Sequence, residues 1–484
     1  MRDVHPAILP AIARCLAWLG LLGASTQAAA AVRYALDYLP ATQEMHVRLC
    51  ADAAAQREFV IARDAAANIA GLAREHGGLQ RLGDTRWRAD RWKSGECLSY
   101  RVALAPIARR NDYDIGVEVG VDMLVAPQYW LLRSDGDEAA EATVSMPDGY
   151  AFSPPWQALD GSTAQQGRFR IPSTPPAWSS LVAVGSFEES TLQLPGGTVR
   201  VAMLGGIDTA NRAKLLRWMQ HALAAASSAH GELPLPQAQV VLRPVALRGG
   251  RAVGFGQSLR GQGNAVHIQV DPKATPDQLD ADWTAVHEFA HWAHPYLGDD
   301  GAWLAEGLAS YWQNTLRARA GLLTPLAAWQ QLDAGFARGR GASNDQLSLA
   351  QLSSAMQRER AYYAVYWSGA AYWLQLDVDL RKTSGGRFGI EEALRRFRAC
   401  CLLQRRAWAP REFVAKLDSL MHSDLFLRRY DAYSARRGFP PLQTIYAQLG
   451  LQRSADGAVQ LRDDAADVAI RRAIMRKPGR ADEP

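Results

Sequence analysis

From residue 31 to about residue 204, apolar and polar residues alternate with the period of a β-strand. The pattern is clear at 32–39 and 45–49, and it predicts further strands at 100–104, 114–121 and 167–171. Helical periodicity is found only at about 64–75, so one short helix is expected there. We therefore predict a β-rich, sandwich-like N-terminal domain over residues 31–204.

The pattern then changes to strands mixed with long amphipathic helices. Residues 249–263 are rich in glycine, and we expect a flexible turn there. Pro295 and Gly298 end a mostly apolar helix and force a turn before the next one. The predicted elements are strands at 199–204, 239–243 and 265–270, and helices at 209–230, 283–292 and 303–316.

After residue 320 the chain is mostly helical. We predict a second domain over 205–320 in which strands and helices are mixed, a helical C-terminal domain over 321–475 and a disordered tail at 476–484. The fold class predicted from these patterns is a multidomain α+β protein.

The chemistry most strongly indicated by the sequence is that of a catalytic zinc ion. His287 and His291 lie four positions apart, which on a helix places both imidazoles on one face. Glu306, fifteen positions after His291, offers a carboxylate from the next helix as the third ligand. Glu288 follows the first ligand directly and is predicted to accept a proton from water. One zinc ion per chain is expected.

The alternative is a buried helix whose histidines bond only to the backbone. A glutamate between two histidines in an apolar helix argues against it, because burying an unpaired charge is costly. His294 stands before Pro295 at a helix end, so we expect it to cap carbonyl groups and not to bind metal. His230 and His267 have no ligand spacing and are expected to be structural.

Two segments resemble known zinc peptidases. The stretch WLAEGLASY around Glu306 resembles the WLxEGxAxY segment of the aminopeptidase N family. The stretch YYAVYWSGAAYWLQLDVDLR, starting at Tyr362, is similar to a conserved segment of the glycyl aminopeptidase family, and Tyr366 takes the place of the catalytic tyrosine there. The resemblance implies a thermolysin-like catalytic domain between a β-rich and a helical domain. Gly369, Leu376, Asp377, Leu380 and Arg381 complete that second pattern.

The chain departs from these families at the substrate site. Their glycine-rich motif carries a glutamate that binds the free amino group of the substrate, and the matching segment here offers Gln257 instead. The spacing from His291 to Glu306 is also about four residues shorter, and Ser368 replaces a lysine. Peptidases of this type hold the substrate backbone on an edge strand, for which we predict the strand that begins with Ala265 and Val266.

These residues predict hydrolysis of peptide bonds, in an aminopeptidase-like manner with endopeptidase activity left open. Zinc lowers the pKa of water to about 7. Glu288 then accepts the proton, and Tyr366, with Tyr362 and Tyr363 as rivals, donates a hydrogen bond to the oxyanion. The absence of the amine-binding glutamate leaves a second reading open, namely a catalytically silent module that holds zinc or a peptide.

Composition narrows the partners and the compartment. The net charge of +5 comes from scattered arginines and not from a basic stripe, which disfavours nucleic acid as a partner. Residues 1–30 combine Arg2 and Arg14 with a short apolar core and a small-residue cleavage site, which predicts a signal peptide and a periplasmic or secreted protein. No later run is long enough for a stable membrane span.

Four cysteines remain after residue 30. Cys50 and Cys97 lie in strand-like segments and are predicted to form a disulfide. Cys400 and Cys401 are adjacent, so a bond between them would be strained, and we expect free thiols or pairing between chains.

Overall fold

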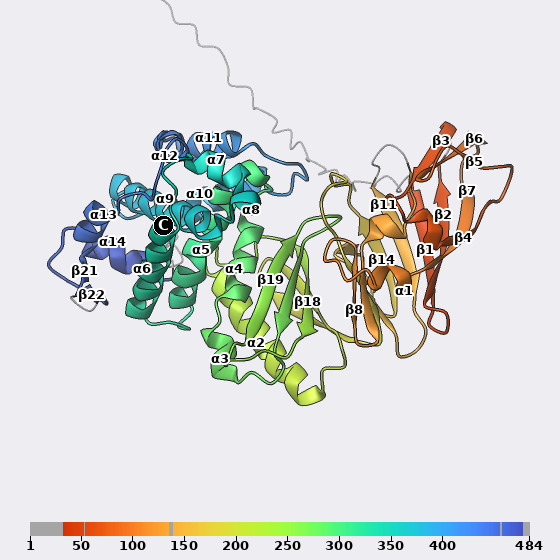
Figure 1. Ribbon diagram of the computed structural model, residues 1–484, viewed down its shortest axis with the longest axis horizontal. Coiled ribbons are helices and arrows are strands. Elements are labelled where there is room, and N and C mark those ends of the chain that lie inside the picture. Colours follow the sequence, from red (N-terminus) through yellow and green to blue (C-terminus); the bar gives the residue numbers. More distant parts are fainter. Residues whose placement is uncertain (1–31, 53, 135–138, 455–456, 478–484) are drawn as a thin grey trace, which may run out of the picture.

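The structure is a computed structural model that describes residues 32–52, 54–134, 139–454 and 457–477. Three regions follow one another along the long axis of the molecule (Figure 1): a β-rich region, a central sheet with helices, and a helical region. The predicted α+β fold class is confirmed. The predicted signal peptide, and all but the first two residues of the predicted tail, lie outside the described residues.

The N-terminal region is built from three sheets that share a hydrophobic core, as expected for a sandwich-like domain. The largest sheet has the order β13-β14-β11-β1-β2-β7-β4. Its strands are β1 (Val32–Leu39), β2 (Glu44–Ala51), β4 (Ile69–Arg74), β7 (Glu96–Ala103), β11 (Ala140–Ser145), β13 (Gln157–Ala158) and β14 (Gln166–Ile171). The smaller sheets contain β3 (Ala54–Val60), β5 (Gln80–Arg81), β6 (Arg86–Trp92) and β10 (Arg133–Ser134), and β8 (Gly116–Val119), β9 (Asp122–Val125), β12 (Ala151–Ser153) and β15 (Val182–Gly185).

The helix expected at 64–75 is wrong. The segment contains one short 3-10 turn at Ala66–Asn68, and its second half forms strand β4 (Ile69–Arg74), which pairs with β7. Gly71 has a φ of +63° at a shift in the register, a conformation that an L-residue in a helix does not adopt. Pairing with a neighbouring strand therefore overrides the local helical pattern.

Both cysteine pairs form disulfides. Cys50 on β2 lies directly opposite Cys97 on β7, and the predicted bond between them is present. Cys400 and Cys401 are also bonded to each other, which corrects the expectation of free thiols or pairing between chains. They lie where helix α10 (Ile390–Cys400) ends, and the chain turns there.

The central sheet has the order β16-β17-β18-β20-β19. Its strands are β16 (Glu188–Leu194), β17 (Gly197–Met203), β18 (Gln237–Pro244), β19 (Val253–Leu259) and β20 (Ala265–Val270). The sheet begins before the domain boundary predicted at residue 204, because β17 pairs in parallel with β18. The glycine-rich stretch at 249–263 was predicted to be a turn, but its middle part forms β19, which lies at the edge of the sheet.

Helices cover one face of this sheet and continue into the C-terminal region (Figure 1). One hydrophobic core runs from the sheet through all of these helices, so residue 320 marks no break in packing. The helices are α2 (Thr209–Ser227), α3 (Pro276–Ala281), α4 (Thr284–Ala290), α5 (Ala302–Arg319), α6 (Pro325–Gly341), α7 (Leu349–Ser354), α8 (Met356–Glu359), α9 (Tyr362–Thr383), α10, α11 (Pro410–Met421), α12 (Leu425–Ser434), α13 (Gln443–Leu449) and α14 (Val468–Met475). The remaining elements are α1 (Ala105–Ala108), β21 (Leu451–Arg453) and β22 (Val459–Leu461).

Helices α5 and α9 approach until their backbones touch, and glycine makes this possible. A methyl group at Gly307 would lie 2.4 Å from the carbonyl carbon of Gly369, and one at Gly369 would lie 1.8 Å from the carbonyl oxygen of Trp303. Glu306 and Tyr366 stand next to this crossing. The close approach therefore brings the predicted third ligand and the predicted tyrosine together.

A buried ionic network fixes α9 against its neighbours. Arg381 donates from Nε to Asp377 (2.9 Å) and from Nη2 to Glu391 on α10 (2.6 Å). The hydroxyl of Tyr311 on α5 donates to the other oxygen of Asp377 at 2.8 Å. Asp377 and Arg381 belong to the segment that resembles the glycyl aminopeptidases, and the structure assigns both of them a structural contact.

Replacing Asp377 with alanine is expected to destabilise the protein by about 3–5 kcal/mol, because Arg381 would remain buried with part of its charge uncompensated. Urea unfolding of the variant checks this. Asp431→Ala, which breaks an exposed ion pair with Arg411, is the control and should cost less than about 1 kcal/mol. Equal midpoints for the two variants would contradict the structural role.

Among the described residues, no helix combines the length and the apolar character that crossing a membrane requires.

Candidate active site

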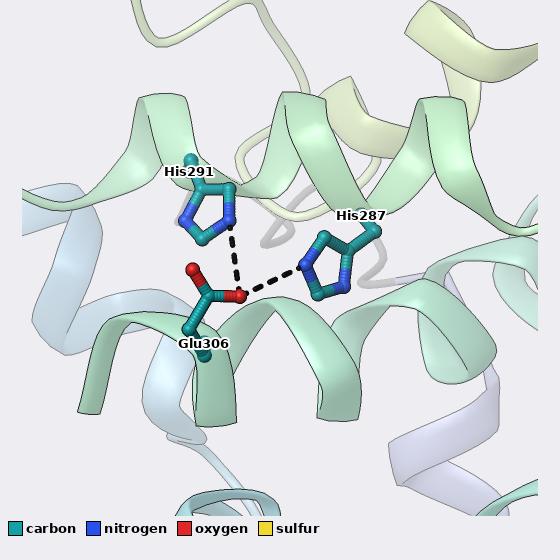
Figure 2. Close-up of side chains that lie close together, drawn as sticks. All are labelled: His287, His291 and Glu306. Carbon is teal, nitrogen blue, oxygen red and sulfur yellow. Dashed lines mark hydrogen bonds and ion pairs between the residues drawn. The ribbon is translucent and has the colours of Figure 1, made fainter. Parts of the chain in front are cut away.

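The predicted metal ligands converge at the interface of α4 and α5. His287 and His291 project from one helical segment and Glu306 from the helix that faces it, and all three side chains point toward one another (Figure 2). The segment keeps helical dihedral angles through His291, although its last turn is a 3-10 turn, so the four-residue spacing still places both rings on one face.

The spacing of the three side chains fits a zinc ion. Oε2 of Glu306 lies 3.2 Å from Nε2 of His287 and 3.7 Å from Nε2 of His291. Two ligands of tetrahedral zinc, each about 2.0–2.2 Å from the metal, are about 3.3 Å apart. Two imidazoles and one carboxylate are also a donor set that zinc accepts, with the fourth position open for water or substrate.

Without a metal, the two histidines differ: burial lowers the pKa of His291, which keeps its imidazole neutral, whereas the pKa of His287 is raised. Burial opposes the charged form of His287, but the hydrogen bond to Glu306 and the nearby carboxylates together raise its pKa. Burial also opposes ionisation of Glu306, yet the two histidines lower its pKa. Glu306 is thus held as a carboxylate, the form that binds metal.

Glu288 is buried beside the ligands and faces strand β19. Burial raises its pKa to about 7, and the backbone N–H of Ser258 donates a hydrogen bond to its carboxylate. Gly256 leaves room for it, because a methyl group there would lie 2.8 Å from Cγ of Glu288. A carboxyl group with a pKa near neutrality is well matched to accept and return a proton.

Tyr366 completes the cluster from α9. Its hydroxyl is hydrogen-bonded to Glu306, and its ring stacks on that of His287 with 6.2 Å between centroids. Burial raises the pKa of Tyr366, so it stays a donor. The two rival tyrosines are more exposed. Tyr362, one helical turn before Tyr366, is 43% exposed, and Tyr363 is 57% exposed. The structure therefore places Tyr366, of the three tyrosines, at the ligands.

Each histidine has a second partner that orients its ring. Nδ1 of His287 lies 2.8 Å from Oε1 of Gln313 on α5, an oxygen that can only accept. Nε2 of His287 shares a proton with Glu306 in the absence of metal. Zinc would displace that proton, and His287 would then keep its proton on Nδ1 and offer Nε2 to the metal. Sequence reasoning missed Gln313, although it lies seven positions after Glu306 and so on nearly the same face of the helix.

His294 plays the same part for His291. Its Nδ1 lies 2.7 Å from the carbonyl oxygen of Pro295, so this nitrogen carries the proton. Its Nε2, 3.0 Å from Nδ1 of His291, is then the acceptor, which leaves Nε2 of His291 free for the metal. The expected capping role is thus incomplete, because the ring of His291 is a second partner. Sequence reasoning also missed Arg260, which bonds to the carbonyl oxygens of His291 (2.5 Å) and His294 (3.0 Å).

Replacing His294 with phenylalanine is expected to weaken zinc binding about 10–100-fold, because His291 loses the acceptor that fixes its tautomer. Competition with a chromogenic chelator measures the affinity. His422→Phe, at an exposed position on the end of α11, is the control. Unchanged zinc affinity in His294→Phe would show that the contact does not orient the ligand.

A cleft of about 700 Å³ surrounds the three ligands. One wall is the edge strand β19, including Gln257, and the others come from α4, α5, α9 and the loop after His294. Ala265 and Val266 were predicted to form the substrate-binding edge, and this is wrong, because β20 lies inside the sheet between β18 and β19 and both residues are fully buried. The free edge belongs to β19.

No family model matches the sequence, and no curated protein matches it. Solved structures do. An aminopeptidase N family protein from Idiomarina loihiensis superposes with a TM-score of 0.65 at 17% identity, covering 90% of this chain and 82% of that one. An M1 zinc metallopeptidase from Deinococcus radiodurans gives 0.52 at 12% identity, over 85% and 94%. The chain has the fold of the aminopeptidase N family. Yeast LTA4 hydrolase, solved in complex with bestatin, shares it at 12% identity and a TM-score of 0.52, over 85% and 68%.

Proposed function

We propose that this protein is a zinc-dependent peptidase. The observation that carries the proposal is the convergence of two correctly oriented imidazoles and a carboxylate, with a second buried carboxyl group and a tyrosine hydroxyl beside them. The shared fold supports it, and a mutant of the Deinococcus radiodurans enzyme was solved with a Tyr-Ser-Ala substrate bound. We accordingly propose a peptide as the substrate and one zinc ion per chain as the cofactor.

Zinc held by His287, His291 and Glu306 would supply Lewis acidity, which polarises a carbonyl group and acidifies water. Glu288 takes a proton from the water while the oxygen of the water bonds to the carbonyl carbon of the peptide. The C–N bond then breaks, and Glu288 returns the proton to the leaving amine. A pKa of about 7 suits both transfers.

Tyr366 acts on the other side of the reacting carbonyl. Its hydroxyl is directed at Glu306, next to the site of the metal, and in the proposed reaction it donates to the carbonyl oxygen as negative charge develops there. Such a donor is worth about 3 kcal/mol in the transition state. Because the pKa of Tyr366 is raised by burial, the proton remains available at neutral pH.

We further propose that the protein works outside the cytoplasm, in the periplasm or as a secreted enzyme. The disulfide between Cys50 and Cys97 supports this, since such bonds persist in oxidising compartments. The Cys400–Cys401 bond points the same way.

Zinc-loaded protein is expected to hydrolyse unmodified peptides, including the bond after their first residue, as an aminopeptidase does. Removal of the metal with a chelator should abolish cleavage, and added zinc should restore it. Mass spectrometry of a defined peptide mixture is the measurement. Zinc bound at one per chain without cleavage of any peptide would favour a silent module that holds zinc or a peptide.

A further inference from the structure

Several of the exposed aromatic side chains among the described residues lie at or beside the cleft. Phe255 (47% exposed), Trp283 (45%) and Tyr296 (38%) line it. Tyr113 packs against Phe255, with ring centroids 5.8 Å apart, and Tyr362 packs against Tyr366 at 6.4 Å. Large apolar side chains exposed together on a soluble protein mark a binding surface. We call Phe255, Trp283 and Tyr296 the aromatic rim.

The aromatic rim extends to both sides of the ligands. Trp283 precedes α4 and contacts the ring of His287, with 5.3 Å between centroids, whereas Tyr296 follows the 3-10 turn beyond His291. Ten helical residues rise about 15 Å, which equals about four to five residues of an extended peptide. A substrate that reaches both ends of the rim therefore has residues on either side of the reacting bond.

Strand β19 supplies a place for the backbone of such a peptide. Its inner edge pairs with β20, and the N–H of Ser258 points away from the sheet to Glu288. Backbone groups of alternate residues on an edge strand point the same way, so those of Gly256 face the cleft as well. An extended chain can pair with them in the manner of β-strand addition.

The cleft holds little to bind a free α-amino group. Four carboxylates line it. Glu306 and Glu288 belong to the reaction centre, and Asp282 accepts a hydrogen bond from the Thr284 N–H at 2.7 Å and lies near Arg251 and Arg317. Asp299 is the exposed carboxylate that remains, and Gln257 is neutral. A buried ammonium group without a carboxylate partner is costly.

We propose, resting on the proposed function, that the cleft grips extended peptides through β19 and through large apolar side chains at the aromatic rim. It therefore cleaves internal bonds as well as terminal ones and does not require a free amino terminus. Recognition comes from backbone pairing and apolar burial on both sides of the reacting bond.

Two peptides test the requirement for the amino group. They share one seven-residue sequence with Leu-Phe at its centre, and one is N-acetylated. We expect kcat/KM values within about threefold of each other and internal scission by mass spectrometry. A preference above about 100-fold for the free peptide, with release of its first residue only, would overturn the inference and leave the peptidase intact. No cleavage of either peptide by zinc-loaded protein would instead remove the proposed function.

Asp299→Asn checks the one carboxylate that could still hold an ammonium group. This substitution is expected to leave the ratio of the two kcat/KM values unchanged. A selective loss of cleavage of the free peptide would assign amine binding to Asp299 and overturn the inference.

Phe255→Ala tests the aromatic rim. It should lower kcat/KM for the acetylated Leu-Phe peptide about tenfold. The effect should be much smaller for an acetylated peptide that differs only in having Ala-Ala in place of Leu-Phe, and the zinc content should not change. Leu39→Ala, at another exposed apolar position, on β1 and far from the cleft in sequence, is the control and should alter neither value. Equal effects of Phe255→Ala on both peptides would show that the rim does not select apolar side chains.

Discussion

Replacing Glu288 with glutamine is expected to lower kcat by about 10²–10⁴-fold while zinc stays bound. Glutamine has the same shape, and its oxygen can still accept the hydrogen bond from the Ser258 N–H. It cannot take a proton from water, so the attack loses its base. Steady-state hydrolysis of a fluorogenic peptide, together with zinc analysis of the same preparation, measures both quantities.

The matched control is Glu118→Gln, on strand β8 of the N-terminal region. Glu118 is exposed and paired only with Arg109, so kcat should not change. A Glu288→Gln protein as active as the native one would rule out Glu288 as the base.

Removing the carboxylate of Glu306 is expected to abolish stable zinc binding. Loss of a residue that merely orients a ligand costs about 10–100-fold in affinity, so loss of the ligand itself in Glu306→Ala should exceed 100-fold. The two histidines that remain lose the group that lies 3.2 Å and 3.7 Å from their Nε2 atoms. Elemental analysis and chelator competition give the stoichiometry and the affinity.

Asp299→Ala and Asp300→Ala are the controls for this experiment. Both aspartates lie on the short turn just before α5, close in sequence to Glu306, and both are exposed. Their removal should leave zinc affinity unchanged. If Glu306→Ala instead keeps one zinc per chain at native affinity, one of these aspartates must be the ligand.

Several features of the site and of the N-terminal region were predictable from the sequence because they depend on local geometry. The spacing of His287 and His291 places two rings on one face of any helix that forms there. The alternating pattern predicted the bounds of β1 without error and located β2, β7 and β14 within a few residues. The pairing of Cys50 with Cys97 followed from two strand-like segments and became a cross-strand bond.

Other features depend on contacts between distant segments. The Ala-rich stretch at 64–75 has a helical pattern, but pairing with β7 makes its second half a strand. The strand at 265–270 was predicted where it occurs. It lies inside the sheet and not at the edge because part of the glycine-rich segment before it forms β19 and pairs with it. A one-dimensional pattern contains no record of which strand is last in a sheet.

The sequence by itself determined the proposed ligand set, the proposed base and the expectation of zinc, because these follow from residue type and from spacing along one helix or the next. Only the tertiary structure decided that β19 is the edge strand beside the cleft, that His294 and Gln313 contact the two histidines, and that Tyr366 reaches Glu306. The physical reason is that backbone contact between Gly307 and Gly369, and the order of strands in the sheet, arise from packing over long sequence separations.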